Sequence, residues 1–172
     1  LPAQIPSPRE KAELIETVGA LRELAGRFAE AIDSFTQGMS IVVADKELAA
    51  EGPLLARFLR RLGAVHQTQA RNKEALSFFN QALSMLREKG SVAHINLLND
   101  LGWSHCVAGD FDKAEELLTQ SLQLVEKLRH QKSAQYGELS ARTLYYFSVL
   151  ALERRDAVLA LQLAERSLSI YE

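Results

Sequence analysis

The chain has 172 residues, 47% of them hydrophobic and 24% charged, and its formal net charge is −2. This length and composition are typical of a globular domain with a substantial core, and they exclude a disordered chain. The nearly balanced charge argues against a dedicated nucleic-acid binder, and no apolar run approaches the roughly 20 residues that a membrane-spanning helix needs.

A single cysteine excludes a disulfide framework and is typical of a reducing compartment, so we predict a cytoplasmic location. The first residue is Leu1 rather than Met, and we therefore expect the chain to be a fragment of a longer protein. Three of the four prolines lie within residues 1–8. Because proline has no backbone N–H to donate within a helix, we interpret this stretch as an extended linker.

Beyond residue 8, good helix formers dominate and apolar residues recur at steps of three and four, which predicts amphipathic helices. No segment shows sustained alternation of apolar and polar residues, so we predict no strands. The predicted helices span residues 9–25, 28–50, 53–69, 72–89, 92–108, 111–131, 135–154 and 157–172.

One sequence pattern occurs four times along the chain. In each copy a small residue precedes an alanine by 12 positions, in the pairs Gly19–Ala31, Gly63–Ala75, Gly102–Ala114 and Ser148–Ala160. We expect each pair to bring two antiparallel helices close together, with Asp110 and Asp156 capping second helices. One such hairpin cannot bury its apolar face alone, so the four repeats should stack. They span residues 9–50, 53–89, 92–131 and 135–172.

The third repeat shows the pattern most completely, in Leu98, Leu101, Gly102, Gly109, Asp110, Phe111, Ala114, Ser121 and Leu122. This pattern resembles the tetratricopeptide repeat (TPR). The small residues lie 44, 39 and 46 positions apart, whereas the standard repeat has about 34 residues. The chain therefore looks like the long-repeat, MalT-like subclass, found in sensor regions of bacterial transcription activators and in scaffold adaptors. The resemblance implies an all-α, right-handed α-solenoid of about four helix–turn–helix units, and a binding module rather than an enzyme.

In TPR arrays the first helix of each repeat lines a concave groove, so the resemblance also implies a binding surface. Trp, Tyr and Arg, the types most frequent at binding hot spots, gather there. The predicted groove residues are Arg57, Arg60, Arg61, Gln67, Asn96, Asn99, Asp100, Trp103, Arg142, Tyr145 and Tyr146. The same positions also include Cys106, Val107, Val149, Leu152 and Glu153.

Each part of this surface has a second interpretation. The arginines are suited to acidic groups of a partner, because the guanidinium fork matches a carboxylate. They are equally suited to pairing with Glu16 and Glu23 of the preceding repeat. The asparagines either bind a peptide backbone or form a solvated polar face, and Trp103 either lines the groove or packs between helices.

Two histidines, His66 and His105, lie three residues after the small residue of their repeats. A metal site would need three or four converging ligands, and only Cys106 accompanies them, so we predict packing histidines and no metal. His94 and His130 lie near predicted helix ends and are expected to be solvent-exposed. No protease, hydrolase or phosphate-loop motif occurs, so we predict neither enzymatic activity nor a cofactor.

We therefore predict a scaffold that binds a protein or peptide segment, for which an acidic partner is one option. The alternative is an effector-sensing regulatory domain of a larger signalling or transcription-regulating protein, which binds a small molecule or another domain of its own chain. The last predicted helix carries the apolar residues Leu161, Leu163, Leu168, Ile170 and Tyr171, so we expect either that the natural protein continues or that this helix is covered by self-association. No direct nucleic-acid or membrane partner is expected.

Overall fold

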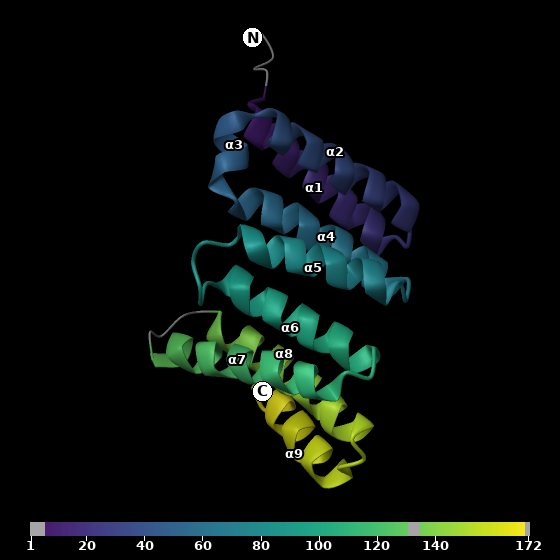
Figure 1. Cartoon of the computed structure of the whole chain (residues 1–172), viewed down its shortest axis with the longest axis vertical. Coiled ribbons are helices and arrows are strands. Elements are labelled where there is room, and N and C mark those ends of the chain that lie inside the picture. The colour runs from purple at the N-terminus through teal and green to yellow at the C-terminus, as the bar shows by residue number, and fades with distance from the viewer. Residues whose placement is uncertain (1–5, 131–134, 171–172) are drawn as a thin grey trace. The chain divides into compact units, whose positions relative to one another are not determined.

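A computed structural model of the chain describes residues 6–130 and 135–170. Within these residues the backbone forms nine α-helices and no strand, in agreement with the predicted all-helical class (Figure 1). The chain divides into two compact units, Leu1–Arg87 and Glu88–Glu172, and each unit contains two of the four repeats. None of the described helices is long and apolar enough to cross a membrane.

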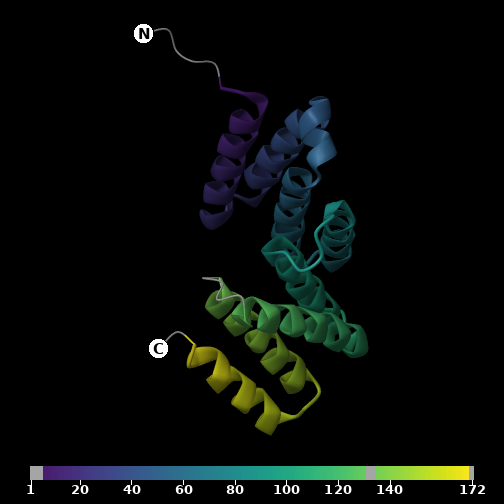
Figure 2. The same cartoon turned by 90° about the vertical axis from the view of Figure 1, so that its left-hand side faces the viewer.

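The first unit contains repeats one and two. Its helices are α1 (Pro8–Leu24), α2 (Phe28–Ala44), α3 (Lys46–Glu51), α4 (Pro53–Thr68) and α5 (Asn72–Met85). Helices α1 and α2 form one antiparallel hairpin and α4 and α5 form the next (Figures 1 and 2). The hairpins pack through α2 against α4, with α3 connecting them.

The second unit repeats this arrangement with repeats three and four. Its helices are α6 (Val92–Val107), α7 (Phe111–His130), α8 (Tyr136–Glu153) and α9 (Ala157–Leu168). Helices α6 and α7 pair, as do α8 and α9, and the two hairpins pack through α7 against α8 and α6 against α8. The first helices of adjacent repeats are therefore neighbours in this unit.

The predicted single helix 28–50 is divided into α2 and α3, contrary to expectation. Asp45 has an extended backbone (φ −97°, ψ 113°), and its carboxylate accepts hydrogen bonds from the amides of Glu47 at 3.0 Å and Leu48 at 3.1 Å. This capping ends α2 and starts the short α3, because the side chain satisfies amides that a new helix leaves unpaired. Parts of the predicted linker and helices, at residues 1–5, 131–134 and 171–172, lie outside the described part of the chain.

The role predicted for the small residues needs a correction. The alanines that follow them by 12 positions are buried, but in the three repeats with a glycine the atoms nearest to an added Cβ belong to the residue 16 positions later. A Cβ atom on Gly19 would lie 2.5 Å from Cε1 of Phe35, and a Cβ on Gly63 would lie 2.5 Å from Cε1 of Phe79. The glycine therefore makes room for a large side chain rather than for a small pair. In the fourth repeat Ser148 replaces the glycine and the position 16 residues later is Ala164.

The four hairpin turns share one backbone conformation. The residue seven positions after the small residue has a positive φ in every repeat, at Gly26 (72°), Ala70 (58°), Gly109 (80°) and Arg155 (64°). Two repeats thus place a residue with a Cβ where glycine is favoured. Asp156 follows one of these turns and caps α9 by accepting from the amide of Leu159 at 3.0 Å, as the sequence predicted.

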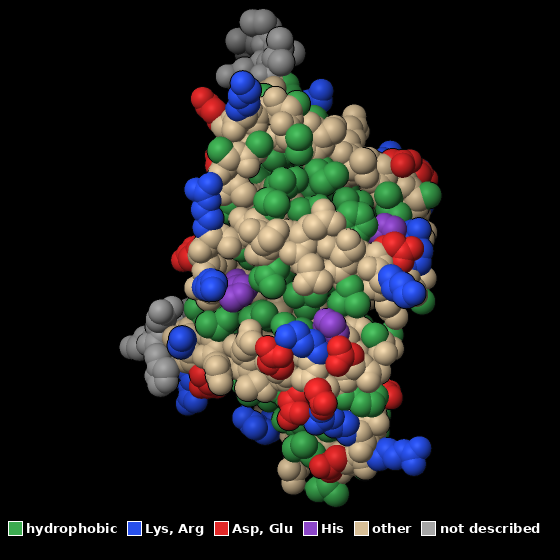
Figure 3. Space-filling view, viewed as in Figure 1, with side chains coloured by type: hydrophobic (Ala, Val, Ile, Leu, Met, Phe, Trp, Pro, Cys, Tyr) green, Lys and Arg blue, Asp and Glu red, His purple; other side chains and the backbone are tan. Residues whose placement is uncertain are grey.

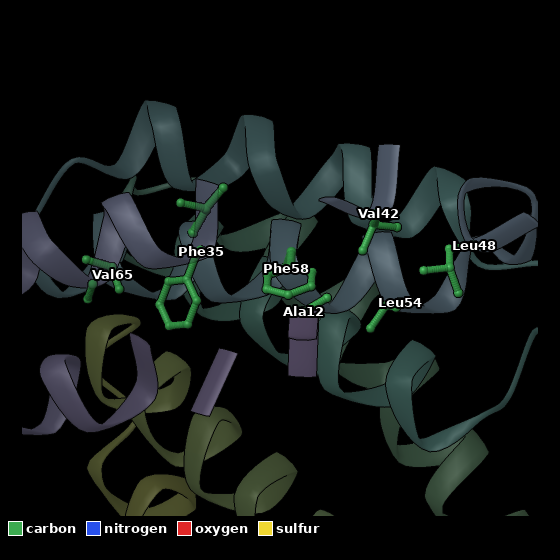
Figure 4. Packing of buried hydrophobic residues seen from close by; sticks show 9 residues of the cluster. Ala12, Phe35, Val42, Leu48, Leu54, Phe58 and Val65 are labelled. Carbon is green, nitrogen blue, oxygen red and sulfur yellow. The ribbon is translucent and has the colours of Figure 1, made fainter. Parts of the chain in front are cut away.

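The core of the first unit consists of large apolar side chains from adjacent hairpins. Phe35 and Val42 of α2 lie with Phe58 and Val65 of α4 in one buried cluster (Figure 4). Phe58 lies close to Gly38, where a Cβ would overlap its ring. This contact fixes the spacing of α2 and α4, because a rigid ring fills the space left by the missing side chain.

Candidate binding surfaces on the first helices

The predicted arginines of repeat two lie on α4 and pair with acidic residues of α1. The Glu16 side chain is only 9% exposed. Its carboxylate accepts from Arg57 Nε at 2.8 Å and from Arg61 Nε at 3.3 Å. Arg57 Nη2 also lies 3.8 Å from Glu13 Oε1. These two guanidinium groups thus neutralise a nearly buried carboxylate. Of the two interpretations given for the arginines, this is pairing with the preceding repeat rather than with a ligand.

The third arginine belongs to the same charged surface. Burial raises the pKa of the Glu23 carboxyl, while the positive charges of Arg61 and Arg60 act in the opposite direction. Gln67 is half-buried further along α4. The first unit therefore presents a charged face on which acidic and basic side chains balance each other.

A corresponding contact occurs in the second unit. Arg142 of α8 stands six positions before the small residue of its repeat, as Arg57 does. Its Nη1 donates to Asn96 Oδ1 at 2.8 Å and its Nη2 donates to Glu138 Oε1 at 2.6 Å. In both units, then, an arginine of the later repeat binds the first helix of the earlier one, and here Asn96 is one of its two partners.

Asn99 and Asp100 are buried, and Asn99 has no exposed surface. The Asn99 Nδ2 donates to Thr143 Oγ1 at 3.0 Å, and Thr143 Oγ1 lies 3.2 Å from Ser121 Oγ. These contacts direct the amide of Asn99 into the packing of α6 against α8 and away from an open face. Sequence reasoning missed Thr143, whose signal is its position: it occupies the place that Phe58 takes in the first unit, five residues before the small residue.

Three predicted aromatic residues come together in the second unit. The rings of Trp103 and Tyr146 stack with centroids 5.4 Å apart and an interplanar angle of 28°. Tyr145 and Tyr146 lie 5.5 Å apart at 50°. We call these three residues the aromatic cluster. Tyr145 is 50% exposed, so the cluster reaches the surface and combines a stacked interior with a ring open to a ligand.

A cavity of about 210 Å³ adjoins this cluster, and its lining residues are Trp103, Cys106, Val107, Val149 and Glu153. We call it the α6–α8 cavity. Burial raises the pKa of the Cys106 thiol, and the nearby charge of Glu153 raises it further. The thiol is therefore protonated near neutral pH and contributes a small apolar surface rather than a nucleophile.

The histidines have separate surroundings. The His66 ring stacks on Phe78 at 5.2 Å, its Nδ1 is buried without a hydrogen-bond partner, and burial lowers its pKa. His105 Nδ1 lies 3.1 Å from Asp110 Oδ2. Among the described residues, no three His, Cys, Asp or Glu side chains converge as a metal site would require.

The expectation of a solvent-exposed His94 was wrong. His94 is half-buried, and its Nδ1 accepts a hydrogen bond from the Gly90 amide at 2.8 Å. Burial lowers the pKa of the ring, and the positive charge of Lys89 lowers it further. The side chain of His130 lies outside the described part of the chain.

Comparison with known proteins identifies the repeats. The family model described as "Tetratricopeptide repeat" matches residues 10–88 and 54–127, which together are more than half of the chain. No curated protein sequence matches the chain.

Several solved structures have a similar fold. BtubC (BKLC) from P. vanneervenii has a TM-score of 0.78 and 17% identity, over 99% of this chain and 66% of that chain. The apo form of RapI has a TM-score of 0.73 and 15% identity, over 96% and 44%. The nearly identical TPR-like repeats of a Podosopora anserina protein assigned as a kinesin light chain give 0.66 and 16%, over 98% and 79%. The chain thus spans 66% of BtubC and 44% of RapI, and at these identities the likeness establishes the fold alone.

Proposed function

Because the chain belongs to the tetratricopeptide repeat family, we propose that it is a protein-interaction scaffold that binds a peptide segment of its partner. The proposed contact surface in the second unit lies on α6 and α8, the first helices of repeats three and four. The chain performs no catalytic step in this proposal.

The observation that carries this proposal is the aromatic cluster beside the α6–α8 cavity. Tyr145 offers an exposed ring, and the Trp103–Tyr146 stack holds the neighbouring rings in place. Aromatic anchors beside a concave surface are typical of binding hot spots. Because rings held in this way have little rotational freedom to lose on binding, the entropic cost of ordering the receptor is small.

The charged residues have a different part in the proposal. Arg57 and Arg61 hold Glu16 in the packing of α4 against α1. A ligand carboxylate would have to displace Glu16, and that would leave a nearly buried charge without its partners. We therefore place the main ligand contacts in the second unit, while Arg60 and Arg142 flank the surfaces of their own units.

A peptide-display library tests the proposal. Random peptides selected on the wild-type chain would be measured against wild type and Tyr145→Ala by the fluorescence of Trp103, the only tryptophan. Val158→Ala on α9 is the matched control, because Val158 is also an exposed apolar residue of the second unit. We expect Tyr145→Ala to weaken binding about tenfold, and Val158→Ala to leave it unchanged. Selected peptides that bind all three proteins equally well would remove the aromatic cluster from the proposed site.

The α6–α8 cavity also supports the alternative of an effector-sensing domain. A cavity of about 210 Å³ lined by Trp103, two valines and a carboxylate can enclose part of a small molecule. Thermal unfolding with a metabolite collection distinguishes the two functions, because a ligand that binds the native state raises the midpoint. Stabilisation by a small molecule in wild type and its loss in Trp103→Ala, which alters the cavity wall, would favour sensing, whereas stabilisation by peptides alone favours the scaffold.

A second candidate function, self-association, is favoured by the apolar residues exposed on α9 and α1. Leu161 and Leu168 of α9 occupy the positions that Ile32 and Met39 occupy on α2, where both pack against the core shared with α4. On α1, Leu14, Val18 and Leu21 occupy the positions of Phe58, Leu62 and Val65 on α4, which are buried. The exposed faces of α9 and α1 thus correspond to the two halves of the α2–α4 contact, and we propose that α9 of one copy packs on α1 of a second copy.

Two charge substitutions test this head-to-tail contact. Leu161→Glu blocks the α9 face and Leu21→Glu blocks the α1 face. We expect wild type to associate with rising concentration in sedimentation velocity, each variant alone to stay monomeric, and their equimolar mixture to form dimers, since each supplies the face that the other lacks. A monomeric wild type at millimolar concentration, or a monomeric mixture, would overturn the contact.

A further inference from the structure

The carboxylate of Glu153 lines the α6–α8 cavity, and no described residue forms an ion pair or hydrogen bond with it. The neighbouring Arg154 is already paired, because it binds Asp112 at 2.8 Å and Glu115 at 2.6 Å. Figure 3 shows the result on one face of the second unit, where acidic and basic side chains lie beside each other over α7. Glu153, in contrast, has no basic partner among the described residues.

The backbone adds to the negative character of the cavity. Helix α6 ends at Val107 and α8 ends at Glu153, and both residues line the cavity. The C-terminus of a helix carries a partial negative charge because its last carbonyl groups have no intrahelical partner. Burial raises the pKa of the Cys106 thiol, and the nearby Glu153 charge raises it further, so both effects disfavour an additional anion at this site.

The remaining lining residues suit the apolar part of a cationic side chain. Val107 and Val149 offer aliphatic walls, and the indole of Trp103 offers a ring. Lysine and arginine bury their methylene stems against such surfaces while the charged end finds a carboxylate or an aromatic face. A volume of about 210 Å³ is below the range of roughly 300–1,000 Å³ typical of small-molecule pockets, and one long side chain occupies it well.

From these observations we infer that the α6–α8 cavity recognises a lysine or arginine side chain of the bound peptide, with Glu153 as its counter-ion and Trp103 as its apolar wall. This inference rests on the proposed function and specifies its ligand class. The bound peptide would thus contain a basic residue that binds to the second unit, which we call the basic anchor. The arginines in the sequence had instead favoured an acidic partner.

The test uses the peptides selected by display on the wild-type chain. We expect one position of the selected peptides to be enriched in lysine or arginine. Glu153→Gln removes the charge and keeps the shape, and Glu165→Gln on α9 is the charge-matched control. The affinity of a selected peptide should fall by about two- to fivefold with Glu153→Gln and stay unchanged with Glu165→Gln. When the basic residue of the peptide is replaced by methionine, Glu153→Gln should have no further effect.

The outcomes separate this inference from the proposed function. Peptides whose binding requires Tyr145 but is the same for wild type and Glu153→Gln would overturn the basic anchor and leave the peptide-binding surface intact. Enrichment of acidic residues at the anchor position would also overturn it. If no selected peptide depends on Tyr145, both proposals fail. Circular dichroism of each variant verifies that Glu153→Gln, a conservative change at an exposed position, leaves the fold in place.

Discussion

Substitution of Gly63 by alanine tests the packing of the repeats most directly. A Cβ on Gly63 would lie 2.5 Å from Cε1, 2.6 Å from Cδ1 and 3.0 Å from Cζ of Phe79. Phe79 is fully buried, so its ring has no free space to enter. Overpacking of this kind costs about 1–3 kcal/mol, and the higher helix propensity of alanine returns about 1 kcal/mol. We therefore expect Gly63→Ala to lower the free energy of unfolding by up to about 2 kcal/mol.

The matched control is Gly137→Ala. Gly137 also lies in a first helix, and its Cβ would meet only Cγ2 of Ile170 at 3.5 Å, an ordinary van der Waals contact. This variant should be neutral or more stable by up to about 1 kcal/mol. Urea unfolding followed by circular dichroism compares the two variants. In a Phe79→Leu background, which lacks the Cε1 and Cζ atoms, Gly63→Ala should cost less. An equal cost in both backgrounds would refute the proposed Gly–Phe contact.

Three further predictions concern single positions. Asn99→Ala should destabilise the second unit by about 1–3 kcal/mol, because it removes a buried hydrogen-bond partner of Thr143; unchanged urea unfolding, followed by Trp103 fluorescence, would contradict this. Ala70→Gly should stabilise the first unit by about 1 kcal/mol in thermal or urea unfolding, since Ala70 has a φ of 58°. The lowered pKa values of His66 and His94 favour the neutral rings in the folded state. As the pH falls below about 6.5 the unfolded chain takes up protons first, so stability should fall as the pH drops towards the lowered folded-state pKa values. His66→Gln should weaken this dependence, and unfolding curves between pH 5 and pH 8 would measure it.

Features set by short-range patterns were predictable from the sequence. The helix periodicity, the hairpin turns and the cap at Asp156 all depend on residues within a few positions of each other. The break at Asp45 was missed because the surrounding residues favour a helix on both sides, and only the capping of Glu47 and Leu48 reveals the interruption. Propensity alone does not distinguish a polar residue on a helix surface from one that starts a new helix.

The candidate site was only partly predictable, because the resemblance to TPR arrays indicates which positions face the groove but not which side chains contact each other. It placed Trp103, Tyr145 and Tyr146 on one surface, and their rings are in contact in the structure. It did not reveal that Asn99 turns inward, since that depends on Thr143, which lies 44 positions away and belongs to another hairpin. Hydrogen bonds between residues so far apart in the chain depend on how the helices pack. In a single sequence, only a comparison of equivalent repeat positions indicates them.

The equivalent positions of the two units explain why we place the ligand in only one of them. Where the first unit packs Phe58 against Gly38, the second has Thr143 with Ser121 and Asn99, so the same contact is made by an aromatic ring in one unit and by hydrogen bonds in the other. On the neighbouring face, the first unit pairs Glu16 with the arginines of α4, and those groups are already satisfied.

At the position that corresponds to Arg61, the second unit has Tyr146, which stacks on Trp103 instead of forming an ion pair. The position that corresponds to Glu16 holds Asn99, so the Glu16–Arg61 ion pair of the first unit has no counterpart in the second. Further along α8, the Glu153 carboxylate lines an apolar cavity and has no ion pair among the described residues. The acidic Glu16 of the first unit is therefore already paired, whereas Glu153 of the second unit is not, and this difference is the reason we propose a charged ligand for the second unit alone.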